Sequence, residues 1–221
     1  MMSAPDPILQ ACQRADGTVT LCLSNGEILE VAPAVLAGAM PQLGEPIPAE
    51  LLGRLRLAAQ RKQIARRLFR ILDRKLHPVA VLRRKLVDEG FDSHEVETVL
   101  AEFAAQDLFS DRRFAEAFCR DTLRRRPVGR RYLFARLHER QVAPDVVDAV
   151  VAELLPADLE LELALVASRQ RWAKIPGPAD RNNEARVFRF LLNSGFPAGT
   201  ARRAARDGAE PSADKAGEEN G

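Results

Sequence analysis

The stretch LRRKLVDEGFDSHEVETVLAEF, residues 82–103, is matched without a gap by two later stretches: LFARLHERQVAPDVVDAVVAEL, residues 133–154, and VFRFLLNSGFPAGTARRAARDG, residues 187–208. In each copy, apolar residues at helical spacing lead to a break, an apolar residue and a second helical pattern. Similarity of a chain to itself at a spacing of about 50 residues is typical of repeat proteins. The three copies therefore predict three tandem helical units.

One position in each copy predicts where the first helix of the pair ends. Gly90 and Gly195 suit the left-handed backbone conformation that follows a helix, because glycine has no Cβ to clash. Gln141 stands at the same position in the middle copy. Ser93 and Pro144 are then expected to begin the next helix, as an N-cap and as a first-turn proline. Each copy is thus a predicted pair of helices joined by a short turn.

A further helix is predicted ahead of each pair. Its apolar residues at helical spacing are Ile64, Leu68, Ile71 and Leu72 in the first unit, Phe114 and Phe118 in the second, and Leu161, Leu165 and Trp172 in the third. A three-helix unit with an exposed apolar face buries that face by stacking on its neighbours. We therefore expect an all-α chain of three tandem three-helix repeats that form an elongated, curved rod.

The N-terminal region has a different pattern. Residues 17–31 alternate apolar and polar side chains around Ser24-Asn25-Gly26, which predicts a β-hairpin with a type I′ turn, whose two central residues have positive φ. Four prolines follow between residues 33 and 48 and predict an irregular connection. The predicted divisions are 1–53 for the hairpin and proline-rich connection, 54–108, 109–155 and 156–207 for the repeats, and 208–221 for an acidic, disordered tail.

Charge is segregated along the chain. Twelve Lys or Arg and one acid lie between Arg54 and Lys85, and ten Lys or Arg with three acids lie between Arg112 and Arg140. Residues 86–110 and 141–163 hold seven and six acids and no Lys or Arg. Stacked units would align their basic helices into a stripe, which is expected of a protein that binds phosphate backbones or an acidic groove of a partner.

Motifs of catalysis are missing from the sequence. It contains no phosphate-binding GxxxxGK[ST], no HExxH and no GxSxG, and its three histidines and three cysteines have no metal-ligand spacing. We therefore predict a protein that is not an enzyme and that uses no cofactor or metal. No run of eighteen apolar residues and no leader pattern is present, so we expect a cytoplasmic protein without a membrane partner.

The run DLFSDRRFAEAFCRDTLRRRPVGRRYLFARLHERQVAPDVVDAVV, residues 107–151, resembles the central signature of the RecX family, regulatory proteins of the bacterial recombinase RecA. The residues that carry the resemblance, with the two turn glycines, are Asp111, Phe114, Ala115, Gly129, Leu137, Gly90 and Gly195. The chain departs from the family pattern at Pro78 and Val81, where Ser and Glu are common, and at Gln141, where Gly is usual. The likeness extends over residues 17–206.

The resemblance implies a modulator of RecA in DNA repair, homologous recombination and the SOS response. Such a protein lodges as a monomer in the groove of the RecA filament on single-stranded DNA and inhibits ATP hydrolysis, strand exchange and repressor cleavage. The residues that we expect to make the contacts are Arg83, Arg84, Lys85, Arg113, Arg120, Arg124, Arg125, Arg126, Arg130 and Arg131.

Two alternatives stay open at the level of sequence. The units could form an independent helix-turn-helix module that binds duplex DNA, since basic helices of such modules enter the major groove. They could also form a plain helical scaffold for protein interactions. Strong recognition of bare single strands is not supported, because aromatic residues make up 5% of the chain and Phe114, Phe118 and Phe134 fall at core spacing.

Overall fold

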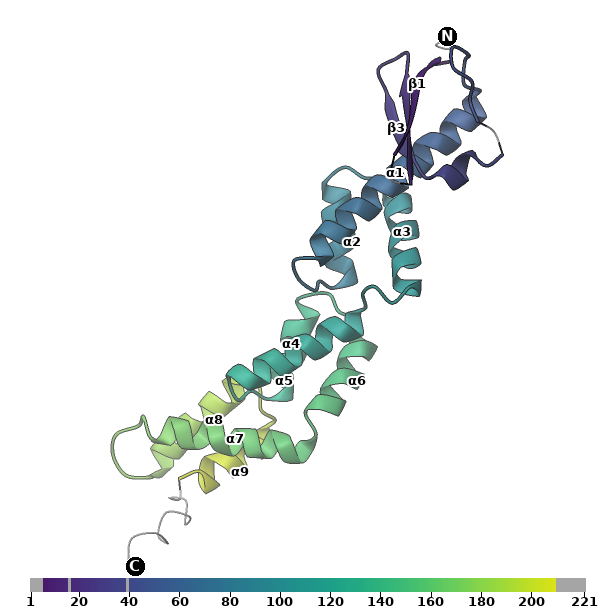
Figure 1. Ribbon diagram of the computed structural model, residues 1–221. Helices are drawn as coiled ribbons and strands as arrows, with labels where there is room; N and C mark the ends of the chain where they lie inside the picture. The colour runs from purple at the N-terminus through teal and green to yellow at the C-terminus, as the bar shows by residue number, and fades with distance from the viewer. Residues whose placement is uncertain (1–5, 16, 39, 210–221) are drawn as a thin grey trace, which may run out of the picture. The chain divides into compact units, whose positions relative to one another are not determined.

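The computed structural model describes residues 6–15, 17–38 and 40–209, which contain a three-stranded sheet and nine α-helices (Figure 1). The strands are β1 (Leu9–Ala15), β2 (Thr18–Leu23) and β3 (Ile28–Val31). The helices are α1 (Ala49–Leu72), α2 (Val79–Asp88), α3 (Ser93–Ala105), α4 (Asp111–Arg125), α5 (Arg130–His138), α6 (Pro144–Leu154), α7 (Ala157–Trp172), α8 (Arg181–Asn193) and α9 (Ala198–Asp207). The predicted fold class, three helices in each of three repeats behind a small β-structure, is confirmed.

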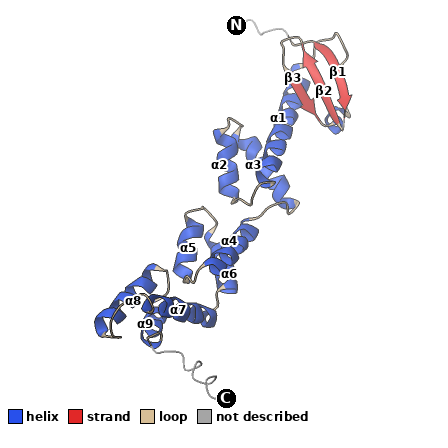
Figure 2. Ribbon diagram, turned by 60° about the vertical axis from the view of Figure 1, so that its left-hand side comes forward, coloured by secondary structure: helices blue, strands red, loops and turns tan. Residues whose placement is uncertain are grey.

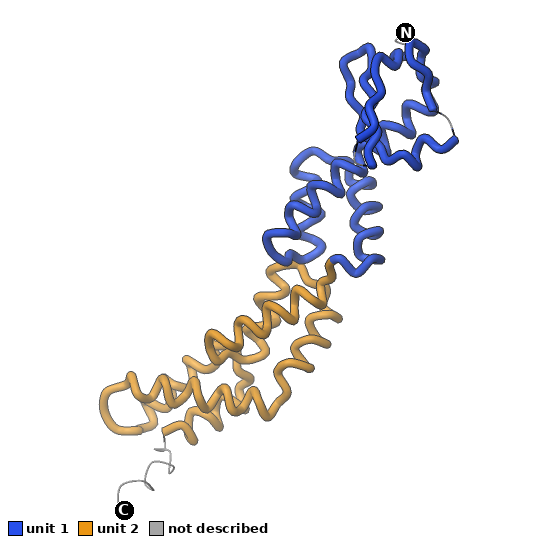
Figure 3. The backbone as a smooth tube through the Cα atoms, viewed as in Figure 1, with its two compact units in different colours: residues 1–108 blue, residues 109–221 orange. Residues whose placement is uncertain are grey.

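The chain divides into two compact units, residues 1–108 and 109–221 (Figure 3). The first holds the sheet with α1 to α3, and the second holds α4 to α9. The boundary predicted at residue 53 falls inside α1, which runs unbroken from Ala49 to Leu72. The predicted tail lies outside the described residues from residue 210 onward, and Gly208 is the C-cap of α9.

The predicted hairpin is formed by β2 and β3, and a third strand extends it. The sheet is antiparallel in the order β1-β2-β3 (Figure 2). The pairing of β1 with β2 shifts register between Leu9 and Ala11. In the sequence of β1, two apolar residues stand together at Ala11-Cys12 and two polar ones at Gln13-Arg14, so the alternation from which a strand is recognised is absent and β1 went unpredicted.

The turn between β2 and β3 is not the predicted type I′ turn. Asn25 does not have positive φ, whereas Gly26 has φ 83°. The Gly26 N–H donates to the Leu23 carbonyl at 2.9 Å, and the Leu23 N–H donates to the Glu27 carbonyl at 2.9 Å. This is a three-residue loop with glycine in the left-handed position, which is the next most common hairpin connection.

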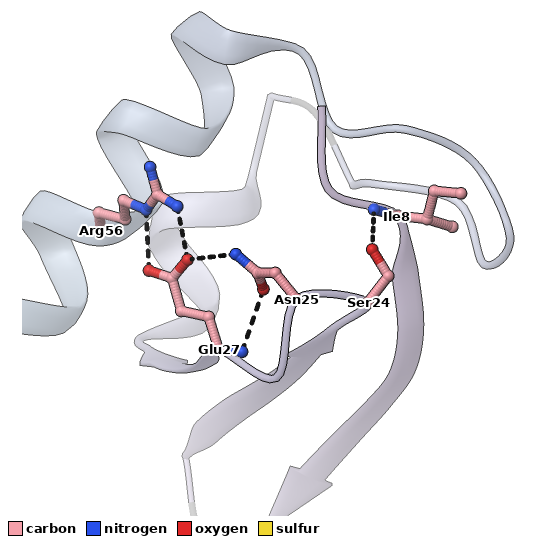
Figure 4. Close-up of polar contacts among 5 residues, drawn as sticks. All are labelled: Ile8, Ser24, Asn25, Glu27 and Arg56. Atoms are coloured by element: carbon pink, nitrogen blue, oxygen red, sulfur yellow. Dashed lines mark hydrogen bonds and ion pairs between the residues drawn. The ribbon is translucent and has the colours of Figure 1, made fainter. Parts of the chain in front are cut away.

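Polar contacts fasten this loop to α1 (Figure 4). Arg56 donates to both carboxylate oxygens of Glu27, through Nε at 2.8 Å and through a terminal nitrogen at 2.5 Å. Asn25 Nδ2 also donates to Glu27, and the Ser24 hydroxyl accepts from the Ile8 N–H at 2.9 Å. The Arg56 guanidinium holds the pKa of Glu27 below its ordinary value.

The two halves of helix α1 pack in two different cores. Leu51, Leu52, Leu55 and Ala59 pack with the inner face of the sheet. In the second half, the predicted stripe of Ile64, Leu68 and Ile71 is buried, as are Leu82 and Leu86 of α2 and Val96, Val99, Leu100 and Phe103 of α3. The sheet therefore closes over the helix that also begins the first repeat.

The turn between the second and third helices of each repeat has the same geometry in all three copies. The left-handed residues are Gly90 (φ 92°), Gln141 (φ 60°) and Gly195 (φ 87°). The N–H of the apolar residue that follows each of them donates to the carbonyl five positions earlier, at 3.3 Å for Phe91, 3.2 Å for Val142 and 3.1 Å for Phe196. These are the bonds of a Schellman motif. Gln141 therefore turns the second repeat just as glycine turns the others.

Of the two expectations for the N-termini of the third helices, one is confirmed and one is wrong. Pro144 is the first residue of α6, as predicted. Asp92, rather than Ser93, is the N-cap of α3, and its carboxylate accepts from the N–H groups of His94 and Glu95 at 2.9 and 3.1 Å. In the third repeat the alanines Ala201, Ala204 and Ala205 of α9 are fully buried.

The buried stripe of the first helix in the later repeats is formed by smaller residues than predicted. In α4 the fully buried residues are Ala115 and Cys119, while Phe114 and Phe118 lie half-buried beside them. Burial raises the pKa of the Cys119 thiol to about 11. In α7 the buried face is Ala164, Ala167 and Ser168, next to the predicted Leu165. Small residues let these helices approach their neighbours closely.

Candidate basic interface

The arginine-rich segment folds as the end of α4, a short extended link and the start of α5. The Ser110 hydroxyl accepts from the Arg113 N–H at 3.1 Å, and Asp111 in the first turn suits the positive end of the helix dipole. At the other end, Arg124 and Arg125 occupy the last turn, where cations are favoured. Arg126 then leaves the helix in an extended conformation, with φ −160° and ψ 147°.

A hollow of about 340 Å³ lies between the end of α4 and α5, and we call it the α4–α5 hollow. Its lining combines four arginines, two acids, two aromatic residues and a threonine: Arg125, Arg126, Arg136, Arg140, Asp121, Glu139, Phe118, Tyr132 and Thr122. The lining carries an excess of positive charge. The geometry suits an anionic partner that reaches into it.

Aromatic rings organise the arginines of the α4–α5 hollow. The guanidinium of Arg126 lies 4.4 Å from the centre of the Tyr132 ring, and that of Arg136 lies 5.2 Å from it. Arg140 lies over the ring of Phe118 at 4.7 Å. The hydrogen bond to Glu139 raises the pKa of Arg136 most, and the hydrogen bond to Tyr132 raises it further. Such stacking holds the guanidinium planes in place while it leaves their N–H edges able to bind a phosphate.

Three of the predicted arginines of α4 pair with acids of their own helix. Arg124 and Arg125 share Asp121 at 3.1 and 3.0 Å, and Arg120 contacts Glu116 at 3.3 Å. The side chains of Arg124 and Arg125 are nevertheless 81% and 74% exposed. Exposed pairs of this kind are worth about 0–1 kcal/mol, so a partner can compete for these arginines at little cost.

Arg130 differs from the other predicted contact residues because its partner is buried. Its Nε donates to Glu160 of α7 at 2.6 Å, and its backbone N–H donates to the same carboxylate at 2.7 Å. The Glu160 side chain is 2% exposed. A buried carboxylate left without its arginine would be strongly destabilising. Arg130 therefore fastens α5 to α7.

Gly129 and Gly195, which carry the family resemblance, bring two turns into backbone contact. The Gly129 N–H donates to the Ser194 carbonyl at 3.0 Å, and the Arg131 N–H donates to the Gly195 carbonyl at 3.1 Å. A Cβ built on Gly129 would lie 2.3 Å from the Gly195 carbonyl oxygen. Only glycine permits this approach, which joins the second repeat to the third.

The predicted residues of the first repeat lie on α2. Arg83 is ion-paired with Glu97 of α3, and Arg84 is exposed. Lys85 Nζ lies 3.4 Å from His77 Nε2. Burial, followed by the charges of Lys85 and Lys75, lowers the pKa of His77. Arg83 thus links the basic second helix to the acidic third helix of its own repeat.

The sequence did not single out Tyr132, Arg136 and Arg140 as a set, although all three line the α4–α5 hollow. They are four residues apart, a spacing that places side chains on one face of a helix, and this pattern could have been recognised in the sequence. Elsewhere in residues 6–15, 17–38 and 40–209, no three His, Cys, Asp or Glu side chains gather as metal ligands would. No helix in those same ranges is long and apolar enough to cross a membrane.

The fold and the basic hollow define a three-helix repeat protein with an arginine-rich surface. Residues 110–151 match the family model for the second three-helix domain of RecX. The regulatory protein RecX of Chromobacterium violaceum is 31% identical over 156 residues, 70% of this chain and 96% of that protein. The regulatory protein RecX of Thermus thermophilus is 36% identical over 62% of this chain and 86% of that protein. The chain belongs to the RecX family.

Solved structures agree on the fold. A crystal structure of regulatory protein RecX matches 91% of this chain and 99% of its own, with a TM-score of 0.71 at 19% identity. The crystal structure of RecX from Lactobacillus salivarius matches 67% of this chain and 96% of its own, with a TM-score of 0.63 at 14% identity.

Proposed function

We propose that this protein is a regulator of the recombinase RecA and has no catalytic activity of its own. It binds in the groove of the RecA filament on single-stranded DNA, and in doing so inhibits ATP hydrolysis, strand exchange and repressor cleavage. Membership of a family of regulatory proteins supports the general role. The observation that carries the proposed mode of binding is the α4–α5 hollow, which is lined by four arginines, three of them over two aromatic rings.

The contact is electrostatic in this proposal. Arg124, Arg125 and Arg126 lie at the exposed end of α4, and Arg124 and Arg125 give up only weak pairs with Asp121 when they meet the partner. Arg113, Arg120 and Arg131 add charge on the same pair of helices, and Arg83, Arg84 and Lys85 contribute from the first repeat. Affinity distributed over many such contacts falls as salt is raised, because counterions compete for them.

The first test is the steady-state ATP hydrolysis of RecA assembled on single-stranded DNA. The protein is titrated below stoichiometric amounts at two salt concentrations. We expect inhibition that weakens at the higher salt. Unchanged hydrolysis, together with tight binding to bare duplex DNA, would instead identify an independent DNA-binding module, and binding without any salt dependence would identify a plain scaffold.

A charge-reversed pair of variants tests the surface. Arg125→Glu with Arg126→Glu should abolish most of the inhibition, since both residues line the α4–α5 hollow. Arg203→Glu with Arg206→Glu is the matched control: it makes the same change of net charge on exposed residues of α9, away from the hollow. Equal loss of inhibition by both variants would remove the hollow from the mechanism.

A further inference from the structure

The third repeat gathers arginines that have no acid beside them. Arg186, Arg189, Phe190 and Asn193 recur on α8 at i, i+3, i+4 and i+7, which is one face of the helix. Arg171, from the last turn of α7, joins that face and lies over the Phe190 ring at 5.4 Å. These five residues line a hollow of about 320 Å³, which we call the α7–α8 hollow.

The hydrogen bonds of these arginines leave their positive charge uncompensated. Arg186 donates to the Asn183 side-chain carbonyl at 3.3 Å, and Arg189 donates to the Ala185 backbone carbonyl at 3.3 Å. The Nε of Arg171 is buried and has no hydrogen-bond partner in the structure. Within the part of the chain that the structure describes, no carboxylate pairs with any of the three or lines the hollow. By contrast, Arg112, Arg120, Arg124 and Arg125 of α4 lie against Asp121 or Glu116.

Three guanidinium groups around one hollow repel one another unless an anion joins them. A phosphate group fits this arrangement, since its oxygens accept paired N–H bonds from guanidinium edges, and such charge-assisted bonds are about twice as strong as neutral ones. The hollow lies open at the surface, with Arg186 and Arg189 exposed. One phosphate of a longer polymer can therefore enter the hollow while the rest of the polymer stays outside it.

Phe190 indicates what is attached to the phosphate. Phe190 is 37% exposed beside the arginines, and the Arg171 guanidinium lies 5.4 Å from the centre of its ring. Aromatic rings next to basic side chains are the stacking surfaces on which proteins bind unpaired bases. We propose that the α7–α8 hollow binds single-stranded nucleic acid directly, with a phosphodiester held by Arg171, Arg186 and Arg189 and a neighbouring base against Phe190.

This site goes beyond the proposed regulation of RecA, because it acts on bare single strands. The test is the fluorescence anisotropy of a labelled oligothymidylate with the full-length protein and no recombinase. Arg186→Gln with Arg189→Gln should weaken binding by about tenfold or more, since hydrogen bonds to charged groups are lost. The slope of log affinity against log salt should fall by roughly 0.7 to 1.4, as expected for one or two phosphate contacts.

Two controls make the result specific. Arg203→Gln with Arg206→Gln removes the same charge from α9, where both residues contact Asp207, and should leave affinity within about twofold. Phe190→Ala should weaken binding to the oligothymidylate by about fivefold or more, but should leave binding to an abasic strand of equal length unchanged. Because Arg186, Arg189 and Phe190 are exposed, their substitution should leave the protein folded, and circular dichroism checks that the helical content is unchanged.

The outcomes separate this site from the proposed function. Equal losses in the α8 and α9 double variants would overturn the site, because general charge would then account for binding. If Phe190→Ala weakened binding to the abasic strand as much as binding to the oligothymidylate, the stacked base would be overturned. If inorganic phosphate saturated the site at the same concentration as the oligonucleotide, nucleic acid would be overturned as the ligand. Inhibition of RecA hydrolysis is measured separately on the same variants, so either proposal can fail while the other stands.

Discussion

Single residues decide how closely the repeats of the second unit approach one another. Gly129→Ala would place a methyl group 2.3 Å from the Gly195 carbonyl oxygen and from the Phe196 nitrogen. Neither backbone atom can move without breaking the turn, so we expect the free energy of unfolding to fall by about 1–3 kcal/mol or more. Urea denaturation followed by circular dichroism measures this fall.

The matched control for Gly129→Ala is Gly199→Ala in α9. A Cβ on Gly199 would meet nothing within 4 Å. Since alanine favours a helix more than glycine does, this variant should gain about 0.5–1 kcal/mol. If both substitutions lowered stability equally, the close backbone contact at Gly129 would not be the cause.

His77 gives the first unit a dependence on pH. Its pKa in the folded protein lies below the ordinary 6.5, because burial, Lys85 and Lys75 all disfavour the proton. The unfolded chain therefore binds the proton first as pH falls, and the free energy of unfolding decreases from about pH 6.5 downward until the folded pKa is reached. Thermal melts between pH 7.5 and 5 measure it, and His77→Gln should flatten this part of the profile. A profile that His77→Gln leaves unchanged would assign the effect to other groups.

At the scale of elements, a Schellman turn joins the second and third helices of each repeat, and one of these turns is strained. Gln141 adopts φ 60°, where a side chain costs about 1–2 kcal/mol relative to glycine. Gln141→Gly should therefore raise the free energy of unfolding by about 1 kcal/mol, after the greater flexibility of glycine in the unfolded chain is subtracted. The melting temperature checks it, and Gly90→Ala at the equivalent turn should shift it in the opposite direction.

The sequence predicted those elements whose signals are local. Apolar spacing located the buried stripe of Ile64, Leu68 and Ile71, and glycine marked two of the three turns. In α4 the same reasoning chose Phe114 and Phe118, because hydrophobicity scales favour large side chains, whereas close helix packing buries Ala115 and Cys119. Strand β1 was missed because apolar and polar residues do not alternate along most of it.

The candidate site was predictable in charge but not in contacts. The run from Arg124 to Arg126 was evident from its composition, and its position at the end of α4 follows from the helix pattern. That Arg130 would face a buried Glu160, 30 residues away, depends on how α5 packs on α7. The approach of Arg171 to Phe190 likewise depends on packing between helices, and composition gives no sign of it.

At the scale of the whole molecule, the two compact units have separate cores. In residues 1–108 the sheet packs with the first half of α1, and the second half of α1 is buried with α2 and α3; in residues 109–221 the buried clusters are formed by α4 to α9. We expect a fragment of residues 109–221 to fold alone, with a cooperative thermal transition and a helical circular dichroism spectrum. A fragment that begins at residue 140 is the control, since it lacks both α4 and α5, and it should not unfold cooperatively. A non-cooperative transition of the longer fragment would contradict independent folding.

The contact between Gly129 and Gly195 also restricts how the gene for this protein can vary. A Cβ on Gly129 would meet main-chain atoms of Gly195 and Phe196, and a Cβ on Gly195 would meet the main-chain nitrogen, Cα and Cβ of Tyr132. No second-site suppressor at one glycine can therefore make room for a side chain at the other. We therefore expect both positions to stay glycine even where the helices around them diverge.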